Sequence, residues 1–129
     1  MKKALLLIAF IACFTACKKE STETKSSIIG TWELRVFTTG WTMPKYYQPG
    51  NGNLYRFNRD SSYVKYEDKQ VKANGKFSIN ITSRENELRY GTITFTDPAY
   101  TDAFNIRGDT INIGTSVADG PAYQYVKIK

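Results

Sequence analysis

The stretch FNIRGDTINI, residues 104–113, decides the fold class. Apolar and polar residues alternate on both sides of a short Arg-Gly-Asp turn, which is the pattern of two antiparallel strands with one buried face. The stretch KFSINIT at 76–82 repeats this alternation with Phe77, Ile79 and Ile81. Nowhere does apolar spacing of three and four residues continue for a dozen positions, so the sequence predicts strands and no long helix.

Residues that favour turns divide the rest of 28–129 into further strands. The predicted turns include 59–61, 73–75 and 83–87. Eight strands are predicted, at 30–38, 53–58, 62–67, 76–82, 88–96, 103–107, 110–114 and 122–128. Short connections favour antiparallel neighbours, and closure into a barrel removes both exposed edges. We therefore expect an all-β domain, an antiparallel up-and-down eight-stranded barrel, with a β-sandwich as the alternative.

Charge and residue usage exclude several classes of function. The 129 residues include 18 Lys and Arg, 12 Asp and Glu and no His, for a net charge of +6. The basic residues are scattered and form no run on a predicted helix, so we expect no nucleic-acid partner. Without His, Ser-His-Asp and Cys-His catalysis and His-containing metal sites are excluded. Phosphate-binding and nucleophile motifs are also missing. We expect a protein that is not an enzyme and that uses no metal or cofactor.

The amino terminus has the pattern of an export signal. Lys2 and Lys3 precede an uncharged apolar stretch, ALLLIAFIACF at 4–14. As a helix this stretch would rise about 17 Å, well short of a bilayer core of about 30 Å, so residues 1–16 are predicted to be a cleaved signal peptide. Phe14-Thr15-Ala16-Cys17 follows and resembles the bacterial lipobox. That resemblance implies that Cys17 is acylated and becomes the mature amino terminus.

Two other interpretations of Cys17 are an ordinary small residue at the end of a leader and half of a disulfide with Cys13. Acylation would make membrane attachment effectively permanent. The polar stretch KKESTETKSS at 18–27 offers no apolar residue to bury and is predicted to be a flexible tether. The expected organisation is therefore a signal peptide at 1–16, a lipidated cysteine and tether at 17–27, and a barrel at 28–129. The expected location is the outer membrane of a gram-negative cell envelope, on its periplasmic or surface face.

The first predicted strand contains IGTWEL at 29–34, which resembles the Gly-x-Trp opening of lipocalins. The stretches LYRF at 54–57, RDSS at 59–62 and GDTI at 108–111 resemble small lipocalin-like bacterial lipoproteins. In lipocalins this Trp lies across the closed end of the barrel, so the resemblance implies a structural role for Trp32.

Lipocalins also carry an Arg near the last strand that packs over the Trp. Lys127 stands in the corresponding region here and can make a cation–π contact instead. We expect Trp32 to be buried near one end of the barrel. The other predicted core residues are Leu34, Phe77, Ile79, Ile81, Phe104, Ile111 and Ile113.

The longest predicted connection is TGWTMPKYYQPGNG at 39–52, which contains Trp41, Tyr46 and Tyr47. In a lipocalin-like barrel the first loop lies over the open mouth as a lid, so these aromatic residues could cover a ligand. Alternatively, they fold back as a small satellite core under the loop. Because the strands are short, any cavity is expected to be small and apolar. The predicted ligand-binding residues are Trp41, Tyr46 and Tyr47 together with Tyr55, Phe57 and Tyr90.

These observations leave two functions open. The first is a lipid-anchored barrel that binds a small hydrophobic ligand. The second is a filled barrel without an internal ligand, which displays its loops to protein or glycan partners at the cell surface. A hydrolase is disfavoured because His and a nucleophile motif are absent. We expect a monomer in either case.

Overall fold

A computed structural model describes residues 23–25, 27–114 and 120–129. Among these residues, 23–25 and 27–28 are helical, and nine strands follow. The strands are β1 (Gly30–Thr39), β2 (Thr42–Tyr46), β3 (Leu54–Phe57), β4 (Ser62–Glu67), β5 (Gln70–Glu85), β6 (Leu88–Phe95), β7 (Tyr100–Arg107), β8 (Thr110–Gly114) and β9 (Ala122–Lys127).

All neighbouring strands are antiparallel and follow the order β2-β1-β3-β4-β5-β6-β7-β8-β9. A further pairing between β1 and β9 closes eight of them into a barrel, and β2 lies outside as an extra strand on β1. The predicted up-and-down eight-stranded barrel is therefore confirmed. The alternative of an open sandwich is wrong because closure pairs the first and last barrel strands.

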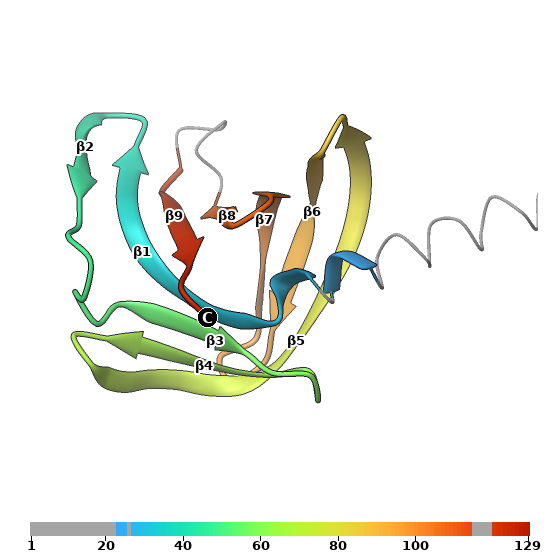
Figure 1. Cartoon of the computed structure of the whole chain (residues 1–129), viewed down its shortest axis with the longest axis horizontal. Coiled ribbons are helices and arrows are strands. Elements are labelled where there is room, and N and C mark those ends of the chain that lie inside the picture. The colour runs from blue at the N-terminus through green and yellow to red at the C-terminus, as the bar shows by residue number, and fades with distance from the viewer. Residues whose placement is uncertain (1–22, 26, 115–119) are drawn as a thin grey trace, which may run out of the picture.

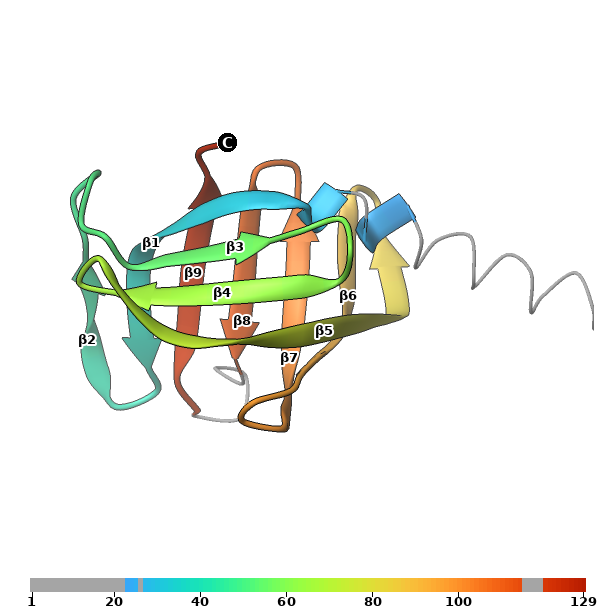
Figure 2. The ribbon, with the colours of Figure 1, turned by 90° about the horizontal axis from the view of Figure 1, so that it is seen from below.

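Two bent strands, β1 and β5, join the layers of the barrel. The first half of β1 pairs with β3 and its second half with β2, while β5 pairs first with β4 and then with β6. The register shifts between Leu34 and Val36 on β1 and between Ile81 and Ser83 on β5, and such bulges bend a strand. As a result, β3 and β4 run across β6 to β9 on the other side of the core (Figure 1, Figure 2).

The strand boundaries differ from the prediction most in β5. Residues 73–75 were expected to form a turn but lie inside β5, where Gly75 pairs with Tyr63. A Cβ at Gly75 would lie 2.5 Å from Thr96 Oγ1, so this glycine serves close packing rather than a turn. The turn comes earlier, at Asp68 and Lys69, which both have positive φ. The predicted turn at 83–87 is also too long, because β5 continues to Glu85.

Alternating side chains fill the barrel with an apolar core. The buried members are Ile28, Trp32, Leu34, Tyr55, Phe57, Tyr63, Phe77, Ile93, Phe95, Phe104, Ile106, Ile111, Ile113 and Tyr125, with Ile79 and Ile81 partly buried against them. Ring centroids of Phe57 and Phe77 lie 4.8 Å apart, as do those of Tyr63 and Phe95. The structure thus brings together all the core residues that the alternation predicts.

The closed end of the barrel is built around Trp32, which is fully buried. Its indole Nε1 donates a 2.7 Å hydrogen bond to the Ile28 carbonyl oxygen. Lys127 Nζ lies 5.4 Å from the centroid of the Trp32 ring and donates a 2.9 Å hydrogen bond to the Ser27 carbonyl oxygen. Lys127 therefore occupies the place over the Trp that the lipocalin resemblance implies.

The segment before Ile28 also covers this end. Thr24 is buried, and Lys25 Nζ contacts Ser61 Oγ and lies 5.8 Å from the Phe77 ring centroid. The prediction of a tether without packing up to residue 27 is therefore wrong for residues 23–25 and 27. The carbonyl oxygens of Ile28 and Ser27 accept hydrogen bonds from Trp32 and Lys127. Sequence composition does not reveal these contacts. The signal peptide, Cys17 and residues 18–22 lie outside the described residues.

Within the part of the chain that the structure describes, no helix is long and apolar enough to cross a bilayer.

Candidate functional site

At the end of the barrel away from Trp32, inward-facing polar and aromatic side chains surround an opening that we call the mouth. Side chains alternate between the inside and the outside of the barrel along each strand. This is clearest on β4, where Tyr63, Lys65 and Glu67 face the inside. The mouth comprises Tyr47, Asn53, Tyr55, Tyr63, Lys65, Glu67, Lys72, Tyr100, Tyr123 and Tyr125.

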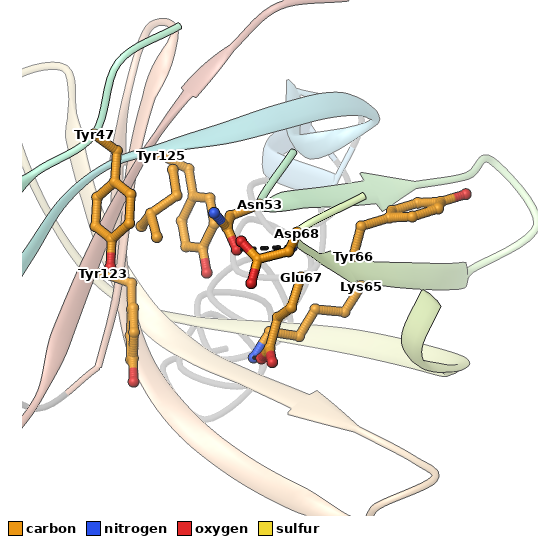
Figure 3. Close-up of a pocket in the computed structure, with 9 residues that line it drawn as sticks. Tyr47, Asn53, Lys65, Tyr66, Glu67, Asp68, Tyr123 and Tyr125 are labelled. Carbon is orange, nitrogen blue, oxygen red and sulfur yellow. Dashed lines mark hydrogen bonds and ion pairs between the residues drawn. The ribbon is translucent and has the colours of Figure 1, made fainter. Parts of the chain in front are cut away.

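Two pockets adjoin in the mouth and share Lys65 and Glu67. The first has a volume of about 230 Å³ and is lined by Leu34, Tyr47, Asn53, Lys65, Tyr66, Glu67, Asp68, Tyr123 and Tyr125. Figure 3 shows three tyrosines on one side of this pocket and the Lys65 and Glu67 side chains on the other. The second pocket has a volume of about 350 Å³ and is lined by Tyr55, Tyr63, Lys65, Glu67, Lys72, Ala73, Pro98 and Tyr100.

Tyr55 connects the mouth to the aromatic core below it. Its ring centroid lies 5.3 Å from that of Tyr125 in an edge arrangement and 5.3 Å from that of Phe57 in a stacked one. Its hydroxyl lies 3.2 Å from the hydroxyl of Tyr100, whose ring stacks on Phe95 at 4.9 Å. Such contacts fix the rings in place, so the aromatic faces that line the mouth are preorganised.

One carboxylate between two ammonium groups gives the mouth its charge. Lys65 Nζ lies 3.2 Å from Glu67 Oε1, and Lys72 Nζ lies 3.8 Å from Glu67 Oε2. Lys65 Nζ also lies 5.6 Å from the Tyr55 ring centroid. Asp68 lines the same pocket, so the charged side chains of the two pockets balance, and the ammonium groups of this partly exposed cluster can pair with a polar or anionic group of a ligand.

Five tyrosine hydroxyls of the mouth have a raised pKa and are neutral at physiological pH. Burial, reinforced by neighbouring tyrosines, raises the pKa of Tyr55 and of Tyr125 far above the usual range. Burial also raises the pKa of Tyr63, of Tyr100 and of Tyr123. These five hydroxyls therefore do not exchange protons near pH 7, and the Tyr63 hydroxyl already donates a 2.8 Å hydrogen bond to the Thr96 carbonyl oxygen.

A buried carboxylate fixes the loop that carries Tyr47. Glu33 Oε1 accepts a 2.7 Å hydrogen bond from the Gly50 N–H, and Glu33 Oε2 pairs with Arg35. Burial acts to raise the pKa of Glu33, but the Arg35 and Gly50 hydrogen bonds and the Arg35 charge outweigh it and lower the pKa. Tyr47 N–H in turn donates a 2.9 Å bond to the Arg35 carbonyl oxygen. Glu33 thus holds this loop beside the mouth as an ionised anchor.

The structure places the predicted lid residues differently from the prediction. Tyr47 lines the mouth, but Trp41 and Tyr46 are 83% and 73% exposed and cover nothing. Both predictions, the lid and the satellite core, are therefore wrong for these two residues. The reason is β2, which pairs residues 42–46 with the second half of β1 and holds this hairpin away from the mouth.

The remaining predicted ligand residues also separate. Tyr55 lines the mouth, whereas Phe57 lies deeper, against Phe77 in the core. Tyr90 pairs with Asn105, on the outer face of the barrel, so its predicted place in a ligand cavity is wrong. In a strand with one polar and one apolar face, the alternation shows which side chains point inward. Around Tyr90 this alternation is ambiguous because Gly91 interrupts it.

The mouth also contains residues that were not predicted, which are Tyr63, Lys65, Glu67, Tyr100, Tyr123 and Tyr125. The expectation of an apolar cavity is accordingly wrong, because β4 directs a lysine and a glutamate inward. Residues 62–67 carry large or charged side chains on both faces, so their alternation does not reveal which face is inside. Tyr100 was missed because β7 begins three residues before the predicted strand.

Among the described residues, no three His, Cys, Asp or Glu side chains lie together in a way that could hold a metal ion. Comparison with protein-family models, with curated proteins and with solved structures finds no match to this chain. The mouth is therefore interpreted from its own geometry.

Proposed function

We propose that this chain is a lipid-anchored cell-envelope protein whose barrel binds a small, mainly hydrophobic molecule that carries a polar group. The observation that carries the proposal is the mouth, where two adjoining pockets expose preorganised tyrosine rings around a Lys-Glu-Lys charge cluster. Ligand sites in proteins are typically concave and combine aromatic or apolar surface with a few placed polar groups, and this mouth combines tyrosine rings with Lys65 and Glu67.

The rings and the charges have separate roles in this binding. Contact with Tyr47, Tyr100 and Tyr123, which are not buried, removes apolar surface from water and contributes about 25 cal/mol per Å² before ordering costs. The neutral hydroxyls and Lys65 orient the polar group of the ligand. We propose binding rather than catalysis. The tyrosines of the mouth whose pKa is raised do not exchange protons near neutral pH.

The cellular address is part of the same proposal. The lipobox resemblance supports acylation of Cys17 and attachment to the outer membrane, and the Gly30-Thr31-Trp32 strand supports a lipocalin-like lipoprotein. Intact-mass analysis of the purified chain should give a mature protein that begins at an acylated Cys17. A Cys17→Ser variant that stays on membranes through salt and carbonate washes would contradict this anchor.

Binding at the mouth is tested by titration of the chain with fatty acids, retinol and the anionic dye 1-anilinonaphthalene-8-sulfonate. Trp41→Phe removes the exposed indole, so the remaining emission comes from Trp32, the cross-strand neighbour of Tyr55. Lys65→Ala should weaken the anionic dye about tenfold, or about 1.4 kcal/mol. The matched control is Lys76→Ala on β5, an exposed lysine that lines neither pocket, which should leave binding unchanged. Saturable binding with the same affinity in Lys65→Ala and Tyr100→Ala as in the parent chain would contradict the site.

The exposed hairpin favours a second candidate function, an interaction protein that contacts a partner. Trp41, Met43 and Tyr46 are 83%, 90% and 73% exposed on neighbouring positions of one hairpin. Gathered exposed apolar side chains mark interaction sites. A photo-crosslinking residue at position 43 in intact cells should then give one discrete adduct that Trp41→Ala abolishes and Lys65→Ala preserves. Absence of any adduct would contradict this second function.

A further inference from the structure

A second concave surface lies on the outside of the barrel, over β7, β8 and β9. Two hollows of about 260 and 340 Å³ meet there and share Asn105 and Asn112. Together they form what we call the amide groove, lined by Val36, Thr38, Leu88, Asn105, Arg107, Thr110, Asn112, Ala122 and Gln124. Figure 1 shows β7 to β9 between the β1–β2 hairpin and the β5–β6 hairpin, which flank this surface.

Three side-chain amides form a ladder along the floor of the groove. The register places Asn105, Asn112 and Gln124 directly opposite one another on β7, β8 and β9. Asn112 Nδ2 donates to Asn105 Oδ1 at 2.9 Å, and Gln124 Nε2 donates to Asn112 Oδ1 at 3.2 Å. Each amide has two N–H groups and one carbonyl oxygen, so these two bonds leave donor and acceptor capacity on all three residues.

The stability of the sheet does not account for these residue types. Asn is depleted in strands, where β-branched residues such as Thr pack better on an outer face. Yet Asn105 and Asn112 occupy facing positions in the middle of β7 and β8, and both are half-buried. The two bonds of the ladder satisfy only part of the hydrogen-bonding capacity of these amides, and residues that weaken a local structural preference are concentrated at functional sites. The ladder therefore indicates recognition of a ligand.

The chemistry of the groove selects the ligand class. Of the residues lining the two hollows in the described part of the chain, Arg107 alone is charged. Amides and threonine hydroxyls both donate and accept hydrogen bonds, as the hydroxyl groups of a sugar do, while Val36, Leu88 and Ala122 offer apolar contacts to sugar C–H groups. From β7 to β9 the ladder spans two strand spacings, roughly 10 Å, which exceeds a single sugar ring.

Pairing in the sheet disfavours a peptide in this place. Extended peptides bind by adding a strand to a free sheet edge. The strands β7, β8 and β9 are each hydrogen-bonded to a strand on both sides, so their backbone groups are already used. We propose that the amide groove binds a neutral oligosaccharide chain through Asn105, Asn112 and Gln124. This site is on the outer face of the barrel wall and does not depend on a ligand in the mouth.

The test is a titration of the ¹⁵N-labelled full chain, purified in detergent, with maltohexaose, cellohexaose and chitohexaose, observed through side-chain amide signals. At least one of the three should shift the signals of Asn105, Asn112 and Gln124 in a saturable way and leave Asn53, which lines the mouth, unchanged. Asn112→Thr should weaken that binding at least tenfold while the melting temperature stays the same or rises. Gln124→Thr is a second variant with the same expectation.

Asn80→Thr is the matched control, because Asn80 is an exposed strand amide on β5 outside the groove. It should leave binding unchanged. The proposal is overturned if none of the three hexasaccharides gives a saturable shift in the groove, or if Asn112→Thr and Gln124→Thr bind as the parent chain does. Equal shifts with an uncharged, unstructured peptide of similar length would overturn it as well, since they would show a surface without selectivity for sugars.

Discussion

The two ends of this barrel are built from the same strands but carry different residues at their inward positions. At the closed end, Trp32, Phe57 and Phe77 pack in the core beside residues 23–25 and 27–28. At the mouth, the inward positions of β4 bear Lys65 and Glu67, beside tyrosines whose hydroxyls reach the opening. Backbone pairing is alike at both ends, so the side chains decide which end is sealed and which can accept a ligand.

The largest expected effect separates the two tryptophans. Trp32→Ala should lower the free energy of unfolding by about 3–5 kcal/mol, because it empties a fully buried site and leaves the Ile28 carbonyl without its indole donor. Trp41→Ala, at an exposed hairpin position, should change it by less than about 0.5 kcal/mol. Urea unfolding followed by circular dichroism measures both. Equal losses in the two variants would break the distinction between a sealed end and an open hairpin.

An intermediate effect is expected at Glu33, whose side chain anchors the loop beside the mouth. Glu33→Gln should cost about 1–3 kcal/mol near neutral pH, because it weakens charge-assisted bonds to Arg35 and Gly50. The folded-state pKa of Glu33 is lowered, so its stabilisation is fully present above the unfolded pKa of about 4.5 and is lost as pH falls through the folded pKa. The gap between parent and variant should therefore shrink below about pH 4.5.

Urea midpoints from pH 7 to pH 2 would show this dependence. A gap between parent and Glu33→Gln that stays constant or widens on acidification would contradict an ionised anchor.

A smaller effect is expected at Lys127, which closes the Trp32 end. Lys127→Met should cost about 1 kcal/mol through loss of the cation–π contact and of the bond to the Ser27 carbonyl. Lys127→Arg should retain most of that stability, since a guanidinium can make both contacts. Thermal unfolding compares the three proteins. If Lys127→Arg loses as much as Lys127→Met, the positive charge over Trp32 is not the stabilising feature.

The smallest effect on stability, under about 0.5 kcal/mol, is expected for Lys65→Ala in the mouth, because its ion pair with Glu67 is partly exposed. The same variant should lose about tenfold in affinity for an anionic ligand, or about 1.4 kcal/mol. This contrast sharpens the comparison, since under the proposed function residues of the sealed end serve stability and those of the mouth serve binding. A Lys65→Ala protein that unfolds more easily by several kcal/mol would place Lys65 with the structural residues instead.

Sequence alone predicts the barrel and the core well, because burial of one face imposes a period of two on Phe77, Ile79 and Ile81 and on the strands around residues 104–113. Sequence alone fails where one residue type occurs in two different structural settings. Gly75 resembles a turn residue, yet it lies in β5 under Thr96.

The site was harder to predict than the fold. Trp41 and Tyr46 were expected near a ligand because the first loop of a lipocalin-like barrel lies over the open mouth, but β2 holds them in solvent. The inward direction of Lys65 and Glu67 depends on register, and both faces of β4 carry aromatic residues. Tyr47 and Tyr55 were predicted, whereas the tyrosines of β7 and β9 required the closed barrel to bring them to the mouth.

The central claim, that the mouth holds a small molecule, is tested most directly by purifying the full chain from its source cells, extracting it into organic solvent and analysing the extract by mass spectrometry. We predict one hydrophobic molecule with a polar group, close to equimolar with the chain, in the parent and in Trp41→Ala, and strongly reduced in Tyr100→Ala. A parent protein that yields no such molecule, or a Tyr100→Ala protein that yields as much as the parent, would contradict the account.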